Sequence, residues 1–181
     1  LGGNVCNGAP SADAVPPLLI YGTRAIIGGP RGRREMLLEE FFLGPGRTAL
    51  GSDEILIELL VPPPPPHSHS HYLRFIPREE MDIAVAGVGS LVALDNSGRC
   101  STVRIALASV APTPARANQA EAVLEGQIPT AALISEAGER AVLSTNPIND
   151  IRGTVEYRQE LTRVLTRRTL VRCLETLGVA L

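Results

Sequence analysis

Residues 83–110, IAVAGVGSLVALDNSGRCSTVRIALASV, contain two apolar runs separated by a turn signal. Both runs are rich in valine, isoleucine and leucine, which favour extended and partly buried backbone. Asn96-Ser97-Gly98 between them holds the residue types that tight turns require. The stretch therefore predicts two antiparallel strands, over Ile83–Leu94 and Cys100–Val110, joined as a hairpin.

Beyond this hairpin the two prolines of APTPAR, residues 111–116, end the strand pattern, and the apolar period becomes helical. Three helices are expected, over Ala117–Leu124, Thr130–Leu143 and Thr154–Leu177. The longest helix is expected to end at Gly178. Its apolar face is predicted to carry Tyr157, Leu161, Val164, Leu165 and Val171, with Arg158, Glu160, Arg163, Arg167 and Arg168 largely elsewhere. A small sheet followed by helices is an α+β pattern, unlike the alternation of parallel folds.

A domain boundary is predicted at VPPPPPHSHSHY, residues 61–72, upstream of the hairpin. Five consecutive prolines cannot enter a helix interior or a central strand, and they favour an extended polyproline conformation. We therefore expect one module over residues 1–66 and another over residues 67–181.

The first module shows the pattern of a short helix followed by strands. Asp13 is a plausible N-cap, with Pro16 and Pro17 in the first turn, where a missing N–H does least harm. The remaining expected elements are a helix through Leu18–Ile20, strands at Thr23–Gly28, Arg33–Leu37 and Glu54–Val61, and a hairpin turn at residues 28–32.

The composition of the 181 residues excludes several classes of protein. Hydrophobic residues make up 44% and charged residues 20%, as in globular proteins, while 3% aromatic residues imply an aliphatic core. A net charge of −2 without a basic block lacks the footprint of a nucleic-acid binder. No apolar run approaches the ~18 residues of a membrane span. The three cysteines, Cys6, Cys100 and Cys173, suit a reducing cytoplasm and form no disulfide or metal-binding pattern.

All three histidines lie in one segment, at His67, His69 and His71. On an extended chain this spacing of two would place them on one face, where they could bind a transition metal. The alternative is a polar, mobile linker after the prolines, which we favour because no cysteine lies nearby and a loop supplies no rigid support for the ligands. No metal site is therefore predicted.

The first residues, GGNVCNGAPSAD at positions 2–13, contain the residue types of a ligand-binding loop. Gly2 and Gly3 let backbone approach a ligand with no Cβ in the way, and consecutive N–H groups can converge on an anion. Asn4 and Asn7 add amide donors and acceptors. Asp13 could accept hydrogen bonds from the hydroxyls of a ribityl chain or a ribose. A cluster of turn residues without a ligand is the alternative.

Five blocks of the sequence, in this order, resemble the FAD-binding medium subunit of the molybdenum hydroxylase family, which includes carbon monoxide dehydrogenase and xanthine dehydrogenase. In GGNVCNGAPSADAVPPLL, Gly2, Gly3, Asn4, Pro10 and Asp13 match the family's second flavin-contacting motif in register. The other blocks are EEFFLGPGRTAL with DEILIELLVP, YLRFIPREEMDIAVAG, VRIALASVAPTPAR, and PINDIRGTVEYRQELTRVLTRRTL.

This resemblance implies an FAD-binding domain of the vanillyl-alcohol-oxidase type, whose second lobe is residues 1–66, followed by a C-terminal domain with an antiparallel sheet and a three-helix bundle over residues 67–181. The residues implied to bind FAD are Gly2, Gly3, Asn4, Asn7, Asp13, Leu50, Tyr72 and Arg74. Leu50 matches an apolar position against the ring system. Arg74 stands where many members have a lysine near the isoalloxazine edge, and Tyr72 could pack on the ring. No catalytic residue is assigned.

The chain departs from the family pattern in three ways. The first lobe, which carries a Gly-rich loop for the pyrophosphate in the family, is absent, so we expect an N-terminally truncated chain that holds half of the flavin site. The threonine or serine that usually precedes the GGN segment is missing. FIPREE, residues 75–80, replaces the more usual F-x-R-R, and the prolines and histidines before it are unusual.

The function implied by the resemblance is electron transfer. Substrate would be hydroxylated on a molybdopterin-binding large subunit, and electrons would pass through an iron–sulfur small subunit to FAD on this subunit and then to NAD, a quinone or another acceptor. The chain itself has no iron–sulfur cysteine pattern and no complete NAD signature, and we expect it to be inactive alone. The alternatives are a non-catalytic module that docks partner subunits with an empty flavin site, and a histidine-rich metal-binding protein.

Overall fold

The computed structural model describes residues 1–78 and 82–181. Residues 79–81, within the block YLRFIPREEMDIAVAG, lie outside the described residues. The helices are α1 (Gly2–Cys6), α2 (Val15–Ile20), α3 (Asn118–Leu124), α4 (Ala131–Ala141) and α5 (Val155–Thr176), with 3-10 turns η1 (Leu38–Glu40) and η2 (Val142–Ser144). The strands are β1 (Arg24–Gly29), β2 (Gly32–Leu37), β3 (Phe42–Gly44), β4 (Arg47–Thr48), β5 (Ile55–Leu60), β6 (Ser68–Phe75), β7 (Ala86–Leu94), β8 (Cys100–Ala108) and β9 (Ala115–Arg116).

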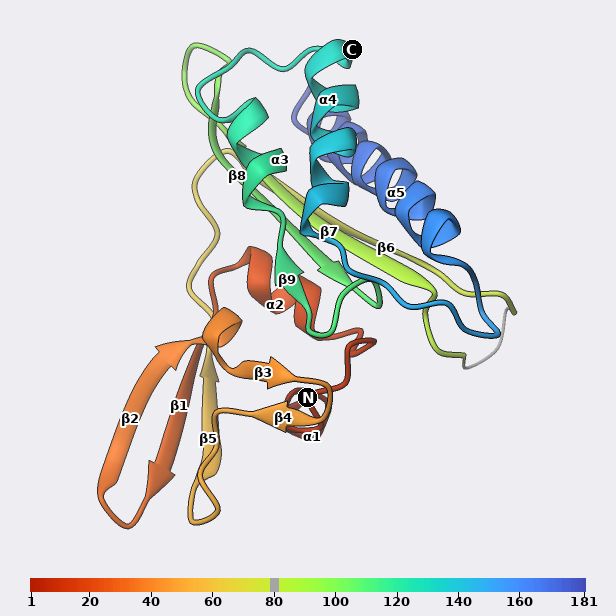
Figure 1. Ribbon diagram of the computed structural model, residues 1–181. Helices are drawn as coiled ribbons and strands as arrows, with labels where there is room; N and C mark the ends of the chain where they lie inside the picture. The colour runs from red at the N-terminus through yellow and green to blue at the C-terminus, as the bar shows by residue number, and fades with distance from the viewer. Residues whose placement is uncertain (79–81) are drawn as a thin grey trace.

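The C-terminal part is an antiparallel sheet of order β6-β7-β8-β9, with α3, α4 and α5 on one face (Figure 1). Its centre is the predicted hairpin: β7 and β8 pair through a turn in which Gly98 has a φ of 79°. Alternate residues of the two strands face the helices and form the larger core, among them Val88, Val92, Val103 and Ile105. The α+β class predicted from the sequence is confirmed.

The opposite face of the same sheet packs against α2. Leu91 and Ala106 project there into a second core, together with Leu19 and Ile20. The α2 backbone lies against Gly89 at ordinary packing distance, because a Cβ built there would lie 3.5 Å from the Pro16 carbonyl carbon. The sheet is therefore the layer that joins the N-terminal and C-terminal parts of the chain.

The N-terminal part contains a three-stranded sheet of order β2-β1-β5 and the small β3-β4 pair (Figure 1). β1 and β2 form the predicted hairpin, and β5 lies at the predicted position. Ala25 and Ile27 of β1 are buried in the second core with the aromatic rings of Phe41 and Phe42, which meet edge to face.

Two N-terminal expectations were wrong. The first residues are not a loop, because Gly2–Cys6 form the short helix α1. Asp13 is not an N-cap: the cap of α2 is Ala14, which makes no side-chain capping bond, and the Asp13 carboxylate is used elsewhere. Val15 begins α2, so Pro16 and Pro17 do lie in its first turn, as predicted.

The Pro-His segment is not a mobile linker, because β6 begins at Ser68 and pairs with β7 along its whole length. His69 and His71 are strand residues. Alternation along the strand places His71 and Leu73 on the side of α5, while Ser70 and Tyr72 face the N-terminal part. β6 therefore carries contacts to both halves of the chain.

The helices α4 and α5 begin at threonine caps, Thr130 and Thr154, whose hydroxyls accept from Leu133 N and Tyr157 N. The predicted apolar face of α5 was right in part: Leu165 is buried, and Leu161 and Val171 pack against the larger core. Tyr157 is 43% exposed, whereas the buried residues of α5 are Arg158, Thr162, Leu165, Thr166, Thr169, Leu170, Cys173 and Leu174. Two of the buried threonines donate to carbonyls of their own helix: Thr162 Oγ1 to Arg158 and Thr169 Oγ1 to Leu165.

Within the described ranges, no helix is long and apolar enough to cross a membrane.

Candidate flavin site

Three of the eight predicted site residues meet in one cluster. The Tyr72 hydroxyl donates to Asp13 Oδ1 at 3.2 Å, and the Arg74 guanidinium donates to Asp13 Oδ2. Tyr72 and Arg74 are two positions apart on β6, so strand alternation presents both side chains on one face. The loop between α1 and α2 brings Asp13 to that face. The cluster joins segments that are about sixty residues apart in the sequence.

The environment of Tyr72 favours its neutral phenol. Burial raises the pKa of Tyr72 well above its usual range, and the charge of Asp13 and the hydrogen bond to it act in the same direction. Gly87 on the neighbouring strand makes room for the phenol, since a Cβ there would lie 2.7 Å from the Tyr72 oxygen. Tyr72 thus acts as a hydrogen-bond donor to Asp13, and the absence of a side chain at Gly87 leaves room for its ring.

Gly2, Gly3 and Asn4 form the first turn of α1. Val5 is the first residue of α1 whose N–H donates to a carbonyl, that of Leu1, at 3.2 Å. The N–H groups of the three preceding residues therefore have no partner within the helix. All three residues are exposed, and no atom lies within 4 Å of a Cβ built at either glycine. Asn4 Oδ1 accepts from the N–H of Ala14 at 3.3 Å, which ties this turn to the residue after Asp13.

Asn7 and Leu50 have different surroundings. Asn7 is exposed and ends α1, where its N–H donates to the Gly3 carbonyl at 3.0 Å. Leu50 is half-buried and packs against the second core. Among the described residues, no hydrogen bond or ion pair links either of them to Asp13.

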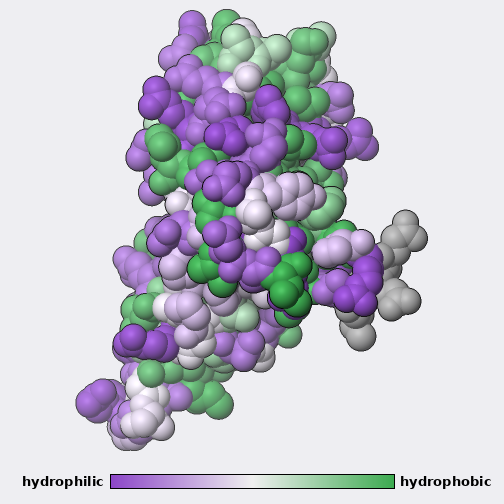
Figure 2. Space-filling model, turned by 45° about the vertical axis from the view of Figure 1, so that its right-hand side comes forward, coloured by the Kyte–Doolittle hydropathy of each residue, from purple (hydrophilic) through white to green (hydrophobic). Residues whose placement is uncertain are grey.

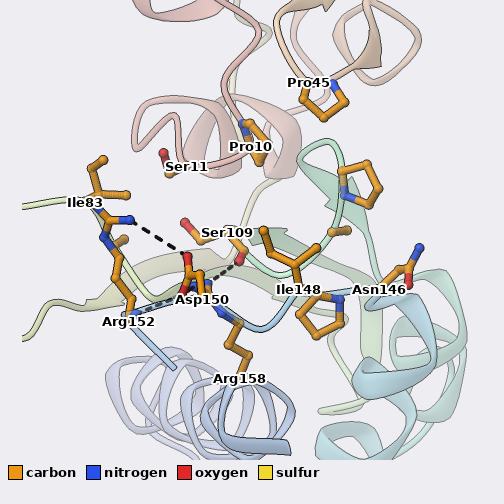
Figure 3. Close-up of a pocket in the computed structure, with 14 residues that line it drawn as sticks. Pro10, Ser11, Pro45, Ile83, Ser109, Asn146, Ile148, Asp150, Arg152 and Arg158 are labelled. Carbon is orange, nitrogen blue, oxygen red and sulfur yellow. Dashed lines mark hydrogen bonds and ion pairs between the residues drawn. The ribbon is translucent and has the colours of Figure 1, made fainter. Parts of the chain in front are cut away.

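A cavity of about 370 Å³ opens next to the same N-terminal loop (Figure 3). Pro10 and Ser11 of that loop form one wall, and Ile83 and Ile148 line it from the C-terminal part. The Ser109 N–H donates to the Pro10 carbonyl at 2.8 Å, which holds the two walls together. The cavity therefore lies where the two parts of the chain meet, close in sequence to Asp13.

Arg158 forms the polar floor of this cavity, although its side chain is 5% exposed (Figure 3). Its guanidinium donates to the carbonyls of Val85 and Ser109, at 2.7 and 2.8 Å, and to Asp150 Oδ1 at 2.8 Å. The hydrogen bond from Arg158 is the first cause that lowers the pKa of Asp150. Arg158 Nε and Ser109 Oγ are buried without a partner among the described residues, and Ser109 has a φ of 67°.

Sequence reasoning missed Arg158, Asp150 and Ser109 as a unit. Arg158 was predicted to lie away from the apolar face of its helix, yet it joins the ends of β7 and β8 to the loop before α5. Arg158 lies four residues before Thr162 and eight before Thr166, so the three share one stripe of the helix, and that stripe is buried. This spacing is the signal that could have identified Arg158 as a buried residue.

The histidines do not gather into a metal site: within the part of the chain that the structure describes, no three histidine, cysteine or acidic side chains lie close enough to hold an ion. His67 lies before β6 with a φ of 51°, and His69 and His71 are in the strand.

Comparison with known families places both parts of the chain. Residues 1–64 match the FAD binding domain in molybdopterin dehydrogenase, and residues 71–173 match the CO dehydrogenase flavoprotein C-terminal domain. The fold and these matches define a flavoprotein of the molybdopterin dehydrogenases. The chain belongs to the family of FAD-binding subunits of xanthine and carbon monoxide dehydrogenases.

Individual relatives agree with this assignment. The xanthine dehydrogenase FAD-binding subunit of Escherichia coli O157:H7 is 34% identical over 98% of this chain. The carbon monoxide dehydrogenase medium chain of Hydrogenophaga pseudoflava is 29% identical over 94% of it. A solved carbon monoxide dehydrogenase from that organism superposes with a TM-score of 0.90 and 31% identity, covering 95% of this chain and 61% of the other.

The chain spans 61% and 58% of the length of these two curated relatives. The match of residues 1–64 to an FAD-binding domain supports the flavoprotein hypothesis, and it gives no support to a docking module with an empty flavin site.

Proposed function

We propose that this chain forms part of the electron-transferring FAD subunit of a molybdenum hydroxylase, and that the cluster of Asp13, Tyr72 and Arg74 with the first turn of α1 holds the flavin. The observation that carries the proposal is the convergence of Asp13 and β6. Two separate blocks of the family resemblance, in the predicted flavin motif and in YLRF, meet at this point through hydrogen bonds.

The side chains at this place fit a flavin nucleotide. The space beside Gly2 and Gly3 is open, because no atom lies within 4 Å of a Cβ built at either position, and free N–H groups of the α1 turn can donate to phosphate or ring oxygens. Asp13 accepts two hydrogen bonds in the structure, and a carboxylate has capacity for about four. Asp13 therefore keeps lone pairs for the hydroxyls of a ribityl chain or a ribose.

FAD, when bound, supplies the redox chemistry, and the chain supplies binding, orientation and electrostatics. Arg74 would stabilise negative charge near its guanidinium as a fixed cation, because arginine does not release its proton. Tyr72 would act as a neutral donor, since its pKa is raised, and Leu50 would offer an apolar surface. Asn4 would keep the α1 turn in register with Asp13 through its bond to Ala14.

The proposal extends to the organisation of the whole protein. We propose that residues 1–66 are the second lobe of an FAD domain of the vanillyl-alcohol-oxidase type, and that residues 67–181 are the C-terminal domain with its three-helix bundle. Two cores support this division, although the second also includes Leu91 and Ala106 of the sheet. The partners would be a molybdopterin-binding large subunit and an iron–sulfur small subunit. Three free cysteines support a cytoplasmic location.

The test is whether the chain takes up flavin. Purified chain is mixed with FAD, dialysed, and examined for the visible absorption of bound flavin. Retained yellow cofactor, decreased in the Asn4→Ala variant, is the expected result. A colourless chain that still captures a molybdopterin-binding subunit would instead favour the docking module.

A further inference from the structure

The outer edge of β6 is open to a further strand. Among the described residues, β6 is an edge strand of the four-stranded sheet and pairs with β7 alone (Figure 1). The Leu94 N–H donates to the His67 carbonyl at 3.0 Å, so His67 and every second residue after it form the hydrogen-bonded pairs with β7. Because hydrogen-bonded pairs alternate in antiparallel strands, the backbone N–H and C=O groups of Ser70 and Tyr72 point away from β7. Unpaired groups of this kind can accept an added strand.

A groove of about 340 Å³ lies beside this strand. β6 contributes His71 and Leu73, and α5 contributes Arg167, Arg168, Val171, Arg172 and Glu175. Leu73 and Val171 pack against the larger core, so the groove has an apolar floor. A strand added along β6 would place every second side chain over this floor or its rim.

The rim of the groove is basic. Three arginines face one carboxylate, Glu175, which lies 3.6 Å from Arg172 in an exposed ion pair. Arg167 and Arg168 form no ion pair with any described residue. In Figure 2, where the side of the molecule that carries α5 is turned forward, hydrophilic side chains dominate the upper half. The positive charge of the three arginines at this rim contrasts with a net charge of −2 for the whole chain.

Packing fixes one of these arginines. A Cβ at Gly138 of α4 would lie 3.0 Å from Cγ of Arg167, so the aliphatic part of this side chain lies tightly against α4. A guanidinium with a restrained stem loses less conformational entropy when it binds a carboxylate. The groove therefore combines open backbone groups, an apolar floor and a partly ordered cation.

We propose that the outer edge of β6 and the arginine side of α5 form a docking site for an extended acidic segment of a partner protein. The segment adds a fifth strand to the sheet next to β6. Its acidic side chains pair with Arg167 and Arg168, and an apolar side chain covers Leu73 and Val171. Charge complementarity selects an acidic partner, and the backbone pairing selects an extended one.

The first test measures binding of a defined peptide to the full chain. The probe is a fluorescein-labelled ten-residue peptide of alternating glutamate and valine, followed by fluorescence anisotropy, with a lysine–valine peptide as comparison. The acidic peptide is expected to bind and the basic one to bind at least about tenfold more weakly. Arg167→Glu with Arg168→Glu should weaken binding about tenfold or more. The matched control, Arg31→Glu with Arg33→Glu on the β1–β2 hairpin, should leave it within about twofold.

The second test separates strand addition from simple charge attraction. Ser70→Pro removes an outward N–H and should abolish binding, whereas Ser70→Ala, which loses the same hydroxyl contact to Tyr21, should retain it. In the unsubstituted chain, saturating peptide should slow amide hydrogen exchange at Ser70 and Tyr72. No binding, equal binding of both peptides, or unchanged exchange at these amides would overturn the proposal, even if the flavin site binds FAD.

Discussion

Asp13 and Tyr72, which are 59 positions apart in the chain, are joined by a 3.2 Å hydrogen bond from the phenol to the carboxylate. The bond connects the loop after α1 to the first strand of the C-terminal sheet. It also depends on a third residue, Gly87, because any Cβ at that position would lie 2.7 Å from the phenol oxygen. The site and the packing between the two parts of the chain are therefore linked at Tyr72.

The Gly87→Ala variant should be destabilised by about 1–3 kcal/mol, because the added methyl group must displace Tyr72 or the β7 backbone. Gly89→Ala is the matched control on the same strand and face. Its Cβ would make ordinary contacts of 3.5 Å, so its stability should change by less than about 1 kcal/mol. Urea unfolding measures both. Equal effects of the two substitutions would show that the space at Gly87 has no special role.

Tyr72 makes stability depend on pH in the alkaline range. Its pKa in the folded chain is raised above the unfolded value of about 10, so folding favours the neutral phenol. This stabilisation is complete below pH ~10 and is lost as pH rises toward the folded pKa. Spectroscopic titration of tyrosine ionisation at 295 nm should show a late phenol that disappears in Tyr72→Phe. A late phenol that persists in this variant would assign the shift to another tyrosine.

Arg158→Ala should cost about 3–5 kcal/mol of unfolding free energy, because it leaves two carbonyls and the Asp150 carboxylate without their buried partner. Arg168→Ala, an exposed position on the same helix, should change stability by less than about 0.5 kcal/mol. Chemical denaturation gives both values. A loss below about 1 kcal/mol for Arg158→Ala would mean that the polar floor of the cavity does not hold the strand ends together.

Local sequence signals predicted the parts of the fold that local interactions determine. The β7–β8 hairpin follows from two β-branched runs around Asn96-Ser97-Gly98, and the starts of α4 and α5 follow from Thr130 and Thr154. In contrast, His69 and His71 were assigned to a linker because no local pattern indicates a strand there. Pairing with β7 supplies the stabilisation that the segment itself lacks.

Long-range contacts explain the other errors. Asp13 has the residue type and position of an N-cap, but partners 59 and 61 positions away determine its role. Arg158 looks like a solvent-facing charge until the carbonyls of Val85 and Ser109 surround it. For the site, resemblance indicated Asp13, Tyr72 and Arg74, and the structure shows that these three residues are in contact. Flavin binding by any of the eight residues remains a prediction, and Leu50 and Asn7 lie outside this cluster.

The most direct measurement is the affinity of the purified chain for FAD, determined by titration of flavin absorbance with the unsubstituted chain, Asp13→Ala and the control Asp53→Ala. Loss of a hydrogen bond to a charged acceptor should weaken binding about tenfold or more in Asp13→Ala. Its stability should fall by about 1–3 kcal/mol, because the Tyr72 hydroxyl loses its acceptor, while the part-exposed ion pair with Arg74 adds little. Asp53→Ala, in an exposed turn, should bind like the unsubstituted chain. Saturable FAD binding that is identical in all three proteins would contradict the assignment of Asp13 to the flavin site.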